Sequence, residues 1–92
     1  MEDEVKRRSK LDIMLAVLST VRNGERKPTK IMYAANMSWN LTQRVFNDLV
    51  EQQLLDYEEI PGQKRSTKRY NLTEKGRNVL KYFEGAKALL NV

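Results

Sequence analysis

The sequence predicts a small α+β fold with a three-helix core, a β-hairpin with a basic tip and an additional C-terminal helix. Three observations predict it. Apolar residues recur at helical spacing in three stretches of the first half of the chain. The pair Pro61-Gly62 then separates two short segments of alternating polarity, a pattern typical of a hairpin. A last amphipathic stretch follows Thr73, a residue type favoured at helix N-caps.

The first helix is expected to begin after Ser9, which can cap it, and to end shortly before a turn at Gly24. The residues before it have mixed charge, so 1–8 are expected to be a charged leader and 9–92 a single domain. The apolar residues of the helix predict one continuous buried stripe. They are Leu11, Met14, Leu15, Leu18 and Val21.

Two further helices are expected on either side of a three-residue turn. Thr29 is the predicted cap of the shorter one, which should be largely buried. Asn36 tolerates a left-handed backbone in the turn, and Ser38 can cap the longer helix. Two helices joined in this way form a helix-turn-helix. The predicted apolar residues are Ile31, Met32, Ala34 and Ala35 in the shorter helix and Leu41, Val45, Phe46, Leu49 and Val50 in the longer one.

The hairpin and the last helix follow. Gln53 stands where many proteins place a glycine after a helix. Gly76 lies in the first turn of the helix capped by Thr73, where glycine costs about 1 kcal/mol relative to alanine, so close packing against a neighbouring element is expected there. The buried face of the hairpin is predicted to contain Tyr57, Tyr70 and Leu72. The apolar residues of the last helix are Val79, Tyr82 or Phe83, Ala86, and Leu89 or Leu90.

Composition limits the functions that this chain can carry. It has no cysteine and no histidine, which excludes disulfides, Cys/His zinc sites and nucleophile–histidine dyads. Its carboxylates form no pattern that places two in an apolar pocket, so we expect no enzyme, no metal and no other cofactor. No apolar run approaches the ~20 residues that span a bilayer, and cytoplasmic residence is expected. The net charge of +5 favours an anionic partner such as nucleic acid.

The outward face of the third helix carries residue types that suit base readout. Asn and Gln pair with adenine edges and Arg with guanine, and a helix that follows such a turn fits the major groove. Any exposed helix face is polar, however, so the basic hairpin is needed to favour DNA. The single tryptophan is expected to be partly buried, and the capping serine can also present backbone amides to a phosphate. The predicted recognition residues are Ser38, Trp39, Asn40, Gln43, Arg44 and Asn47.

The hairpin supplies the second predicted contact. It carries four cations and no acidic residue between Pro61 and Leu72. Such a tip suits a phosphate backbone, although a charged edge also discourages aggregation between strands. Lys30, on the second helix, is a further candidate for a backbone contact. The predicted cations of the hairpin are Lys64 and Arg65 at the tip and Lys68 and Arg69 on the returning strand.

Three segments together resemble the archaeal winged-helix (winged helix-turn-helix) DNA-binding proteins, a family of small transcription regulators. They are Thr29-Lys30-Ile31-Met32-Tyr33-Ala34-Ala35-Asn36-Met37-Ser38, Leu54-Leu55 and Tyr70-Asn71-Leu72-Thr73-Glu74-Lys75-Gly76. The resemblance implies a winged-helix fold, with the third helix as recognition helix and the hairpin as wing. It also implies dimers formed through the terminal helices. Because the last helix ends soon after Leu90, a short contact between the first and last helices is expected rather than a long coiled coil.

We therefore predict a homodimeric transcription regulator that binds double-stranded DNA. The alternative is a winged-helix module that binds an acidic protein face and has no strong affinity for DNA. RNA or single-stranded DNA is a weaker prediction, because it needs exposed aromatic side chains for base stacking. Only Trp39 is expected to offer one, with Tyr57 and Tyr70 in the sheet.

Overall fold

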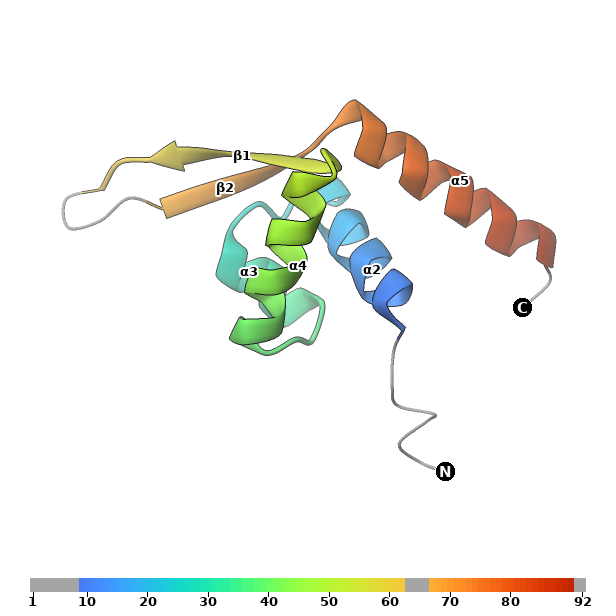
Figure 1. The fold of residues 1–92 in the computed structure, drawn as a ribbon, viewed down its shortest axis with the longest axis horizontal. Helices are drawn as coiled ribbons and strands as arrows, with labels where there is room; N and C mark the ends of the chain where they lie inside the picture. The colour runs from blue at the N-terminus through green and yellow to red at the C-terminus, as the bar shows by residue number, and fades with distance from the viewer. Residues whose placement is uncertain (1–8, 63–66, 91–92) are drawn as a thin grey trace, which may run out of the picture.

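The computed structural model describes residues 9–62 and 67–90. In this part of the chain, four helices and one antiparallel hairpin confirm the α+β winged-helix arrangement. The hairpin and the last helix extend in opposite directions from the three-helix core (Figure 1). The elements in chain order are α2 (Lys10–Arg22), α3 (Pro28–Ala34), α4 (Trp39–Glu51), β1 (Leu55–Ile60), β2 (Thr67–Leu72) and α5 (Glu74–Leu90).

The core lies where α2, α3 and α4 meet the base of the hairpin. Phe46 of α4 is fully buried and stacks on Tyr70 of β2, with ring centroids 4.1 Å apart. This contact fixes the hairpin to the helix that precedes it. Leu80 of α5 is also buried, although its place in the apolar pattern of that helix was not predicted. Further core residues are Leu15, Val17, Leu18, Val21, Ile31, Ala35, Val45, Leu49, Leu54 and Leu55.

Three of the predicted helix caps are confirmed. The Oγ atoms of Ser9 and Ser38 accept hydrogen bonds from backbone amides three residues later, at 3.0 and 3.2 Å. The Oγ1 of Thr73 accepts one from the amide of Gly76 at 2.9 Å. The predicted cap at Thr29 is wrong, because α3 begins one residue earlier with Pro28. Proline at the first helical position has the required φ and lacks an amide that would need a partner.

The C-terminal ends of α2, α3 and α4 share one geometry. In each, a residue with positive φ stands two positions after the helix: Gly24 at 111°, Asn36 at 57° and Gln53 at 64°. At the end of α4, the amides of Gln53 and Leu54 donate to the carbonyls of Val50 and Leu49 at 2.9 and 2.8 Å. This is the Schellman pattern of hydrogen bonds. Asn36 therefore adopts the predicted left-handed backbone, and Gln53 adopts it where a glycine is more usual.

Several predicted buried residues are exposed. Leu11 is 45% exposed because α2 has only just begun there and no neighbouring element covers it, so the predicted stripe starts at Met14. Tyr57 lies directly across from Tyr70 but is 42% exposed, since Tyr70 occupies the space against Phe46. Ala34 is exposed as well. On α5 the outward residues are Tyr82, Leu89 and Leu90.

Gly76 packs tightly against its neighbours, as its place in the first turn of α5 predicted. A Cβ atom added there would lie 2.1 Å from the carbonyl oxygen of Leu54 and 2.9 Å from the Cδ1 of Leu72. The hydroxyl of Thr73 donates to the carbonyls of Gln53 and Leu54 at 2.7 and 3.0 Å, so the same turn ties α5 to the end of α4. Glycine at this position therefore lets three elements meet.

Candidate nucleic-acid interface

The start of α4 is fixed by two residues of its first turn. Ser38 caps the helix, and its carbonyl accepts a hydrogen bond from the Oγ1 of Thr42 at 2.7 Å. Thr42 is fully buried, although no apolar pattern predicted it. Its hydroxyl finds a local partner, which is why a polar residue is tolerated on the inner face of the helix. Burial of Thr42 with the apolar residues of the inner face therefore sets the rotation of α4 about its axis.

That rotation turns a polar row outward from α4. Asn40, Arg44 and Asn47 are exposed and recur at spacings of four and three residues, so they share one face. Gln43 is half-buried at the edge of this face. The opposite face holds Thr42, Val45, Phe46 and Leu49 in the core. The structure thus brings the predicted recognition residues together on the exposed side of one helix.

Trp39 lies at the edge of an open groove beside this row. Its side chain is 47% exposed, so it is about half covered. The groove has a volume of about 700 Å³ and runs between the start of α3, the start of α4 and strand β2. Met32 lines the groove near Trp39, whereas Met37 packs against the core. The residues that line the groove are Lys27, Pro28, Thr29, Met32, Trp39, Gln43, Thr67, Lys68, Arg69 and Tyr70.

The hairpin contributes cations to this groove from β2. The predicted tip residues Lys64 and Arg65 lie outside the described residues. Lys68 and Arg69 are half-buried and line the groove. The Nζ of Lys68 also stands 4.5 Å from the centroid of the Tyr57 ring, a cation–π contact that holds the lysine against the strand.

Sequence reasoning missed the acidic residues that face these cations across the hairpin. In the register of the two strands, Glu58 is paired with Arg69 and Glu59 with Lys68. The absence of acids between Pro61 and Leu72 therefore does not make the whole hairpin basic. A two-residue turn at Pro61-Gly62 would instead pair Glu58 with Arg65 and Glu59 with Lys64, so the observed register was needed to place these carboxylates opposite Arg69 and Lys68.

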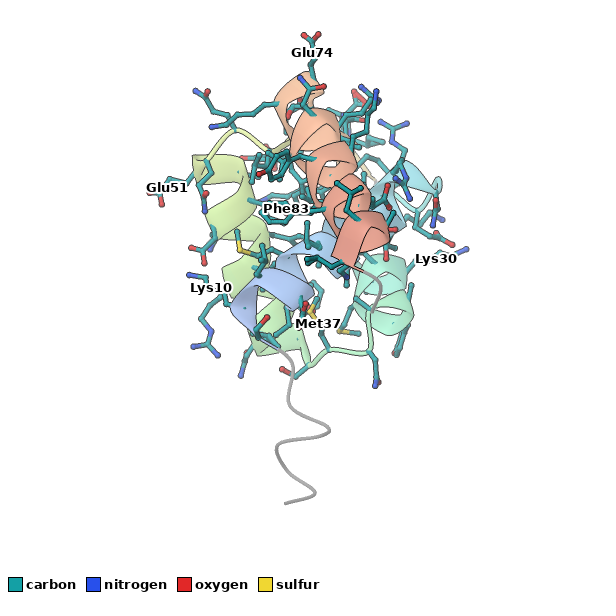
Figure 2. All side chains as sticks on the ribbon, turned by 90° about the vertical axis from the view of Figure 1, so that its right-hand side faces the viewer. Lys10, Lys30, Met37, Glu51, Glu74 and Phe83 are labelled. Carbon is teal, nitrogen blue, oxygen red and sulfur yellow. The ribbon has the colours of Figure 1, made fainter. Side chains whose placement is uncertain are left out.

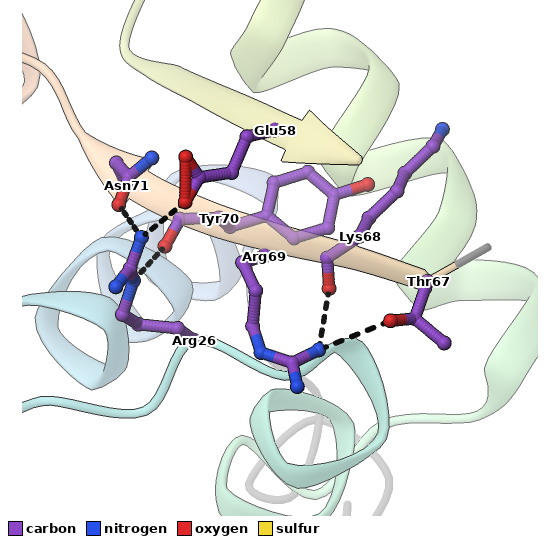
Figure 3. Close-up of polar contacts among 7 residues, drawn as sticks. All are labelled: Arg26, Glu58, Thr67, Lys68, Arg69, Tyr70 and Asn71. Atoms are coloured by element: carbon purple, nitrogen blue, oxygen red, sulfur yellow. Dashed lines mark hydrogen bonds and ion pairs between the residues drawn. The ribbon is translucent and has the colours of Figure 1, made fainter. Parts of the chain in front are cut away.

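Arg26 lies against the hairpin, which binds its side chain although 45% of that side chain stays exposed (Figure 3). Its Nε donates to the carbonyl of Tyr70 at 3.4 Å and its Nη2 to the side-chain oxygen of Asn71. The same Nη2 forms an ion pair with Glu58 at 3.4 Å. In return, the amide of Tyr70 donates to the carbonyl of Arg26 at 2.9 Å. The segment before α3 is thereby joined to β2 through both main chain and side chain.

The cations near the groove are not neutralised in the same way. Among residues 9–62 and 67–90, ion pairs occupy Lys10, Arg22 and Arg26. No described carboxylate pairs with Lys30, Arg44, Lys68 or Arg69. Lys30 extends outward from α3 on the surface of the molecule (Figure 2). Positive charge on α3, α4 and β2 is therefore available to an anion.

A second surface lies between α2 and α5, away from the groove. Arg22 donates to the carboxylate of Glu84 at 2.7 Å, and this hydrogen bond lowers the pKa of the Glu84 carboxyl. Phe83 of α5 packs against the core (Figure 2). Between the two helices lies an open groove of about 330 Å³, and the last turns of α5 expose apolar side chains beyond it. The exposed residues there are Tyr82, Leu89 and Leu90.

Membrane-spanning helices and acidic metal sites are both absent from the described residues. None of the described helices is long and apolar enough to cross a membrane. Within the same ranges, no group of three or more acidic side chains is placed to hold a metal ion. The polar row of α4, the groove and the surface of α5 are thus the features that remain to be explained.

Comparison with known proteins agrees with this architecture. An uncharacterized protein of Methanocaldococcus jannaschii, MJ0290, is 32% identical over 78 residues, which are 85% of this chain and 33% of that protein. The chain therefore spans about a third of the length of this relative. Two solved structures share the fold at low sequence identity. A PadR-like transcription factor from Bacteroides fragilis has a TM-score of 0.81 at 20% identity, covering 89% of this chain and 85% of its own.

The second structure is a PadR family transcription regulator from Clostridium difficile. It has a TM-score of 0.76 at 13% identity, covering 86% of this chain and 90% of its own. The sequence itself matches the family model described as winged helix-turn-helix over residues 7–91, nearly its whole length. This chain belongs to the winged helix-turn-helix family.

Proposed function

We propose that this protein binds double-stranded DNA as a homodimeric transcription regulator, with α4 in the major groove and the hairpin on the backbone or minor groove. One observation carries the proposal. The exposed polar row of α4 adjoins an open groove whose far wall bears the unpaired cations Lys68 and Arg69. Side chains that can contact base edges thus lie next to side chains that can contact phosphates. A helix bound in the major groove requires this arrangement.

Base recognition is assigned to the outward row of α4. Asn40, Gln43 and Asn47 have the amide groups that pair with adenine, and Arg44 has the fork that pairs with the O6 and N7 of guanine. Trp39, half exposed beside Gln43, offers an apolar surface to a sugar or a thymine methyl. Ser38 positions these residues as the cap of α4, where its side chain accepts a hydrogen bond from the amide of Leu41.

Phosphate contact is assigned to residues that flank α4. Lys30 projects from α3, while Lys68 and Arg69 face the groove from β2. Lys64 and Arg65 remain candidates at the tip. Arg26 is excluded from this role, since its guanidinium group is already bound to Tyr70, Asn71 and Glu58. Each phosphate contact contributes affinity without sequence preference.

Dimerisation is assigned to α2 and α5. The last turns of α5 expose Tyr82, Leu89 and Leu90, and Leu89 is 87% exposed. Tyr82 and Leu89 lie seven residues apart and so share a face of the helix. An exposed apolar face of this kind suits the same surface of a second copy. Two recognition helices of such a dimer are expected about 34–36 Å apart on one face of the duplex.

An arginine substitution tests the assignment of base readout. Arg44→Ala should remove about 1–3 kcal/mol of discrimination at one base pair and leave non-specific binding nearly unchanged. Lys68→Ala combined with Arg69→Ala should weaken binding to every duplex and make its salt dependence shallower. Selection from a random duplex library, followed by titration at several salt concentrations, measures both. Equal effects of the two changes on sequence preference would show that the roles are wrongly assigned.

A change at the end of α5 tests the dimer. Leu89→Asp with Leu90→Asp places two charges on the apolar face and should convert a dimer into a monomer, as measured by light scattering. Lys81→Ala, on another side of α5, is the matched control and should leave the mass unchanged. A monomeric wild-type protein, or a double variant that remains dimeric, would place the interface elsewhere or remove it.

A further inference from the structure

One of the two oppositely charged register pairs of the hairpin, Glu58 and Arg69, forms no ion pair. Glu58 and Arg69 are register partners on β1 and β2, an arrangement that normally favours an ion pair. The Nη1 of Arg69 instead donates to the Oγ1 of Thr67 at 3.3 Å and to the carbonyl of Lys68 at 3.4 Å. Both bonds are long and neither involves a charged acceptor. Arg69 therefore has no ion pair with a described carboxylate.

Glu58 pairs with Arg26 instead. The Nη2 of Arg26 lies 3.4 Å from the Oε1 of Glu58 and also binds Asn71 (Figure 3). In the same view, Arg69 extends to the other side, toward the start of α3. The residues beside it there, Lys27 and Thr29, line the same groove. Arg69, which has no ion pair within the hairpin, is thus presented to the groove.

We infer that Arg26 is a positioning residue that holds Glu58 away from Arg69 and so makes Arg69 available to a DNA phosphate in the groove. The inference rests on the proposed function for the identity of the anion. Arg26 acts through its positive charge. Because its guanidinium group pairs with Glu58, that carboxylate does not pair with Arg69. The backbone bond between Tyr70 and the carbonyl of Arg26 does not depend on the side chain and survives its replacement.

The DNA arm of the test measures how binding depends on salt. Each phosphate contact contributes about 0.9 to the slope of log affinity against log salt, so Arg26→Ala should lower the slope by about 0.9 as Glu58 captures Arg69. Between 50 and 200 mM salt this is a change of about 3-fold in relative affinity. Arg69→Ala should cause the same loss, and Arg26→Ala should add nothing to it.

Two rescues separate this role from a purely structural one. Glu58→Gln in the Arg26→Ala protein should restore the wild-type slope, because no carboxylate is left to capture Arg69. Arg26→Lys should also retain the slope, since a lysine still pairs with Glu58. Arg77→Ala removes an exposed arginine of α5 and is the control for net charge. If Glu58→Gln fails to restore the slope, the inference is overturned.

A second arm needs no DNA. Double-mutant cycles in urea compare Glu58→Gln and Arg69→Ala, alone and together, by their shifts of the unfolding midpoint. With Arg26 present the two shifts should add, and with Arg26→Ala they should not, because Glu58 and Arg69 are then partners. Additive shifts in both backgrounds would overturn the inference. If the cycles behave as expected but the wild-type protein binds no duplex, the proposed function fails and the role of Arg26 in the hairpin stands.

Discussion

At the scale of single residues, backbone conformation at the helix ends places α4 and the hairpin. Gly24, Asn36 and Gln53 each take a positive φ, and each closes its helix with the same pair of hydrogen bonds. Glycine and asparagine adopt this conformation readily, whereas glutamine pays about 1–2 kcal/mol for it. Gln53 is tolerated because the bonds it completes set the direction of the chain from α4 into β1.

Gln53→Gly should therefore stabilise the protein. We expect the free energy of unfolding to increase by about 1 kcal/mol, reduced by the greater conformational entropy that glycine loses on folding. For a domain of this size, each kcal/mol should raise the melting temperature by about 4–8 °C. Thermal unfolding followed by circular dichroism measures it. Gln52→Gly is the matched control, because Gln52 has an ordinary φ of −84° and should lose stability on the same change. A Gln53→Gly protein that melts lower than wild type would contradict this account.

Local features of the sequence predicted single residues well where the interaction itself is local. Ser9, Ser38 and Thr73 cap helices through bonds that span three residues, so residue type and position suffice to predict them. Exposure depends on distant neighbours, which the sequence alone does not place. Leu11 and Tyr57 fit their apolar patterns but are exposed, since nothing covers the start of α2 and Tyr70 already fills the space beside Phe46.

At the scale of elements, the junction of α4, the hairpin and α5 depends on the absence of a side chain at Gly76. Glycine in a helix was enough to predict close packing, but not the carbonyl of Leu54 as its partner. The opposite charges across the hairpin follow from strand register, which depends on the length of the turn. For this reason the sequence predicted the cations that line the groove but not Glu58 and Glu59 opposite two of them.

Two glycines of α5 provide a matched pair for testing the junction. Gly76→Ala should destabilise the protein by about 1–3 kcal/mol, because the new Cβ would lie 2.1 Å from a backbone oxygen that cannot easily move. Gly85→Ala should instead stabilise it by up to about 1 kcal/mol, since nothing lies within 4 Å of a Cβ there and alanine favours the helix. Urea unfolding of both variants measures the difference. Equal effects of the same sign would mean that Gly76 is not confined as described.

At the scale of the whole molecule, two surfaces extend from one three-helix core in different directions. The hairpin and α4 form the groove with its cations, while α5 carries its apolar residues away from it (Figure 1). A contact between two copies through α5 would leave the groove between α3, α4 and β2 open in each copy. The proposed dimer and the proposed DNA contact are thus compatible in one assembly, in which two copies of α4 read half-sites related by two-fold symmetry.

Titration of a labelled random-sequence duplex at several salt concentrations, with anisotropy and complex mass measured together, tests the central claim most directly. We expect binding that weakens steeply as salt increases, with two protein chains per complex and a preference for duplex over single-stranded competitor. Stronger competition by single strands would favour the stacking mode of recognition. No binding to the duplex even at low salt would contradict the account and point to an acidic protein as the partner of the groove.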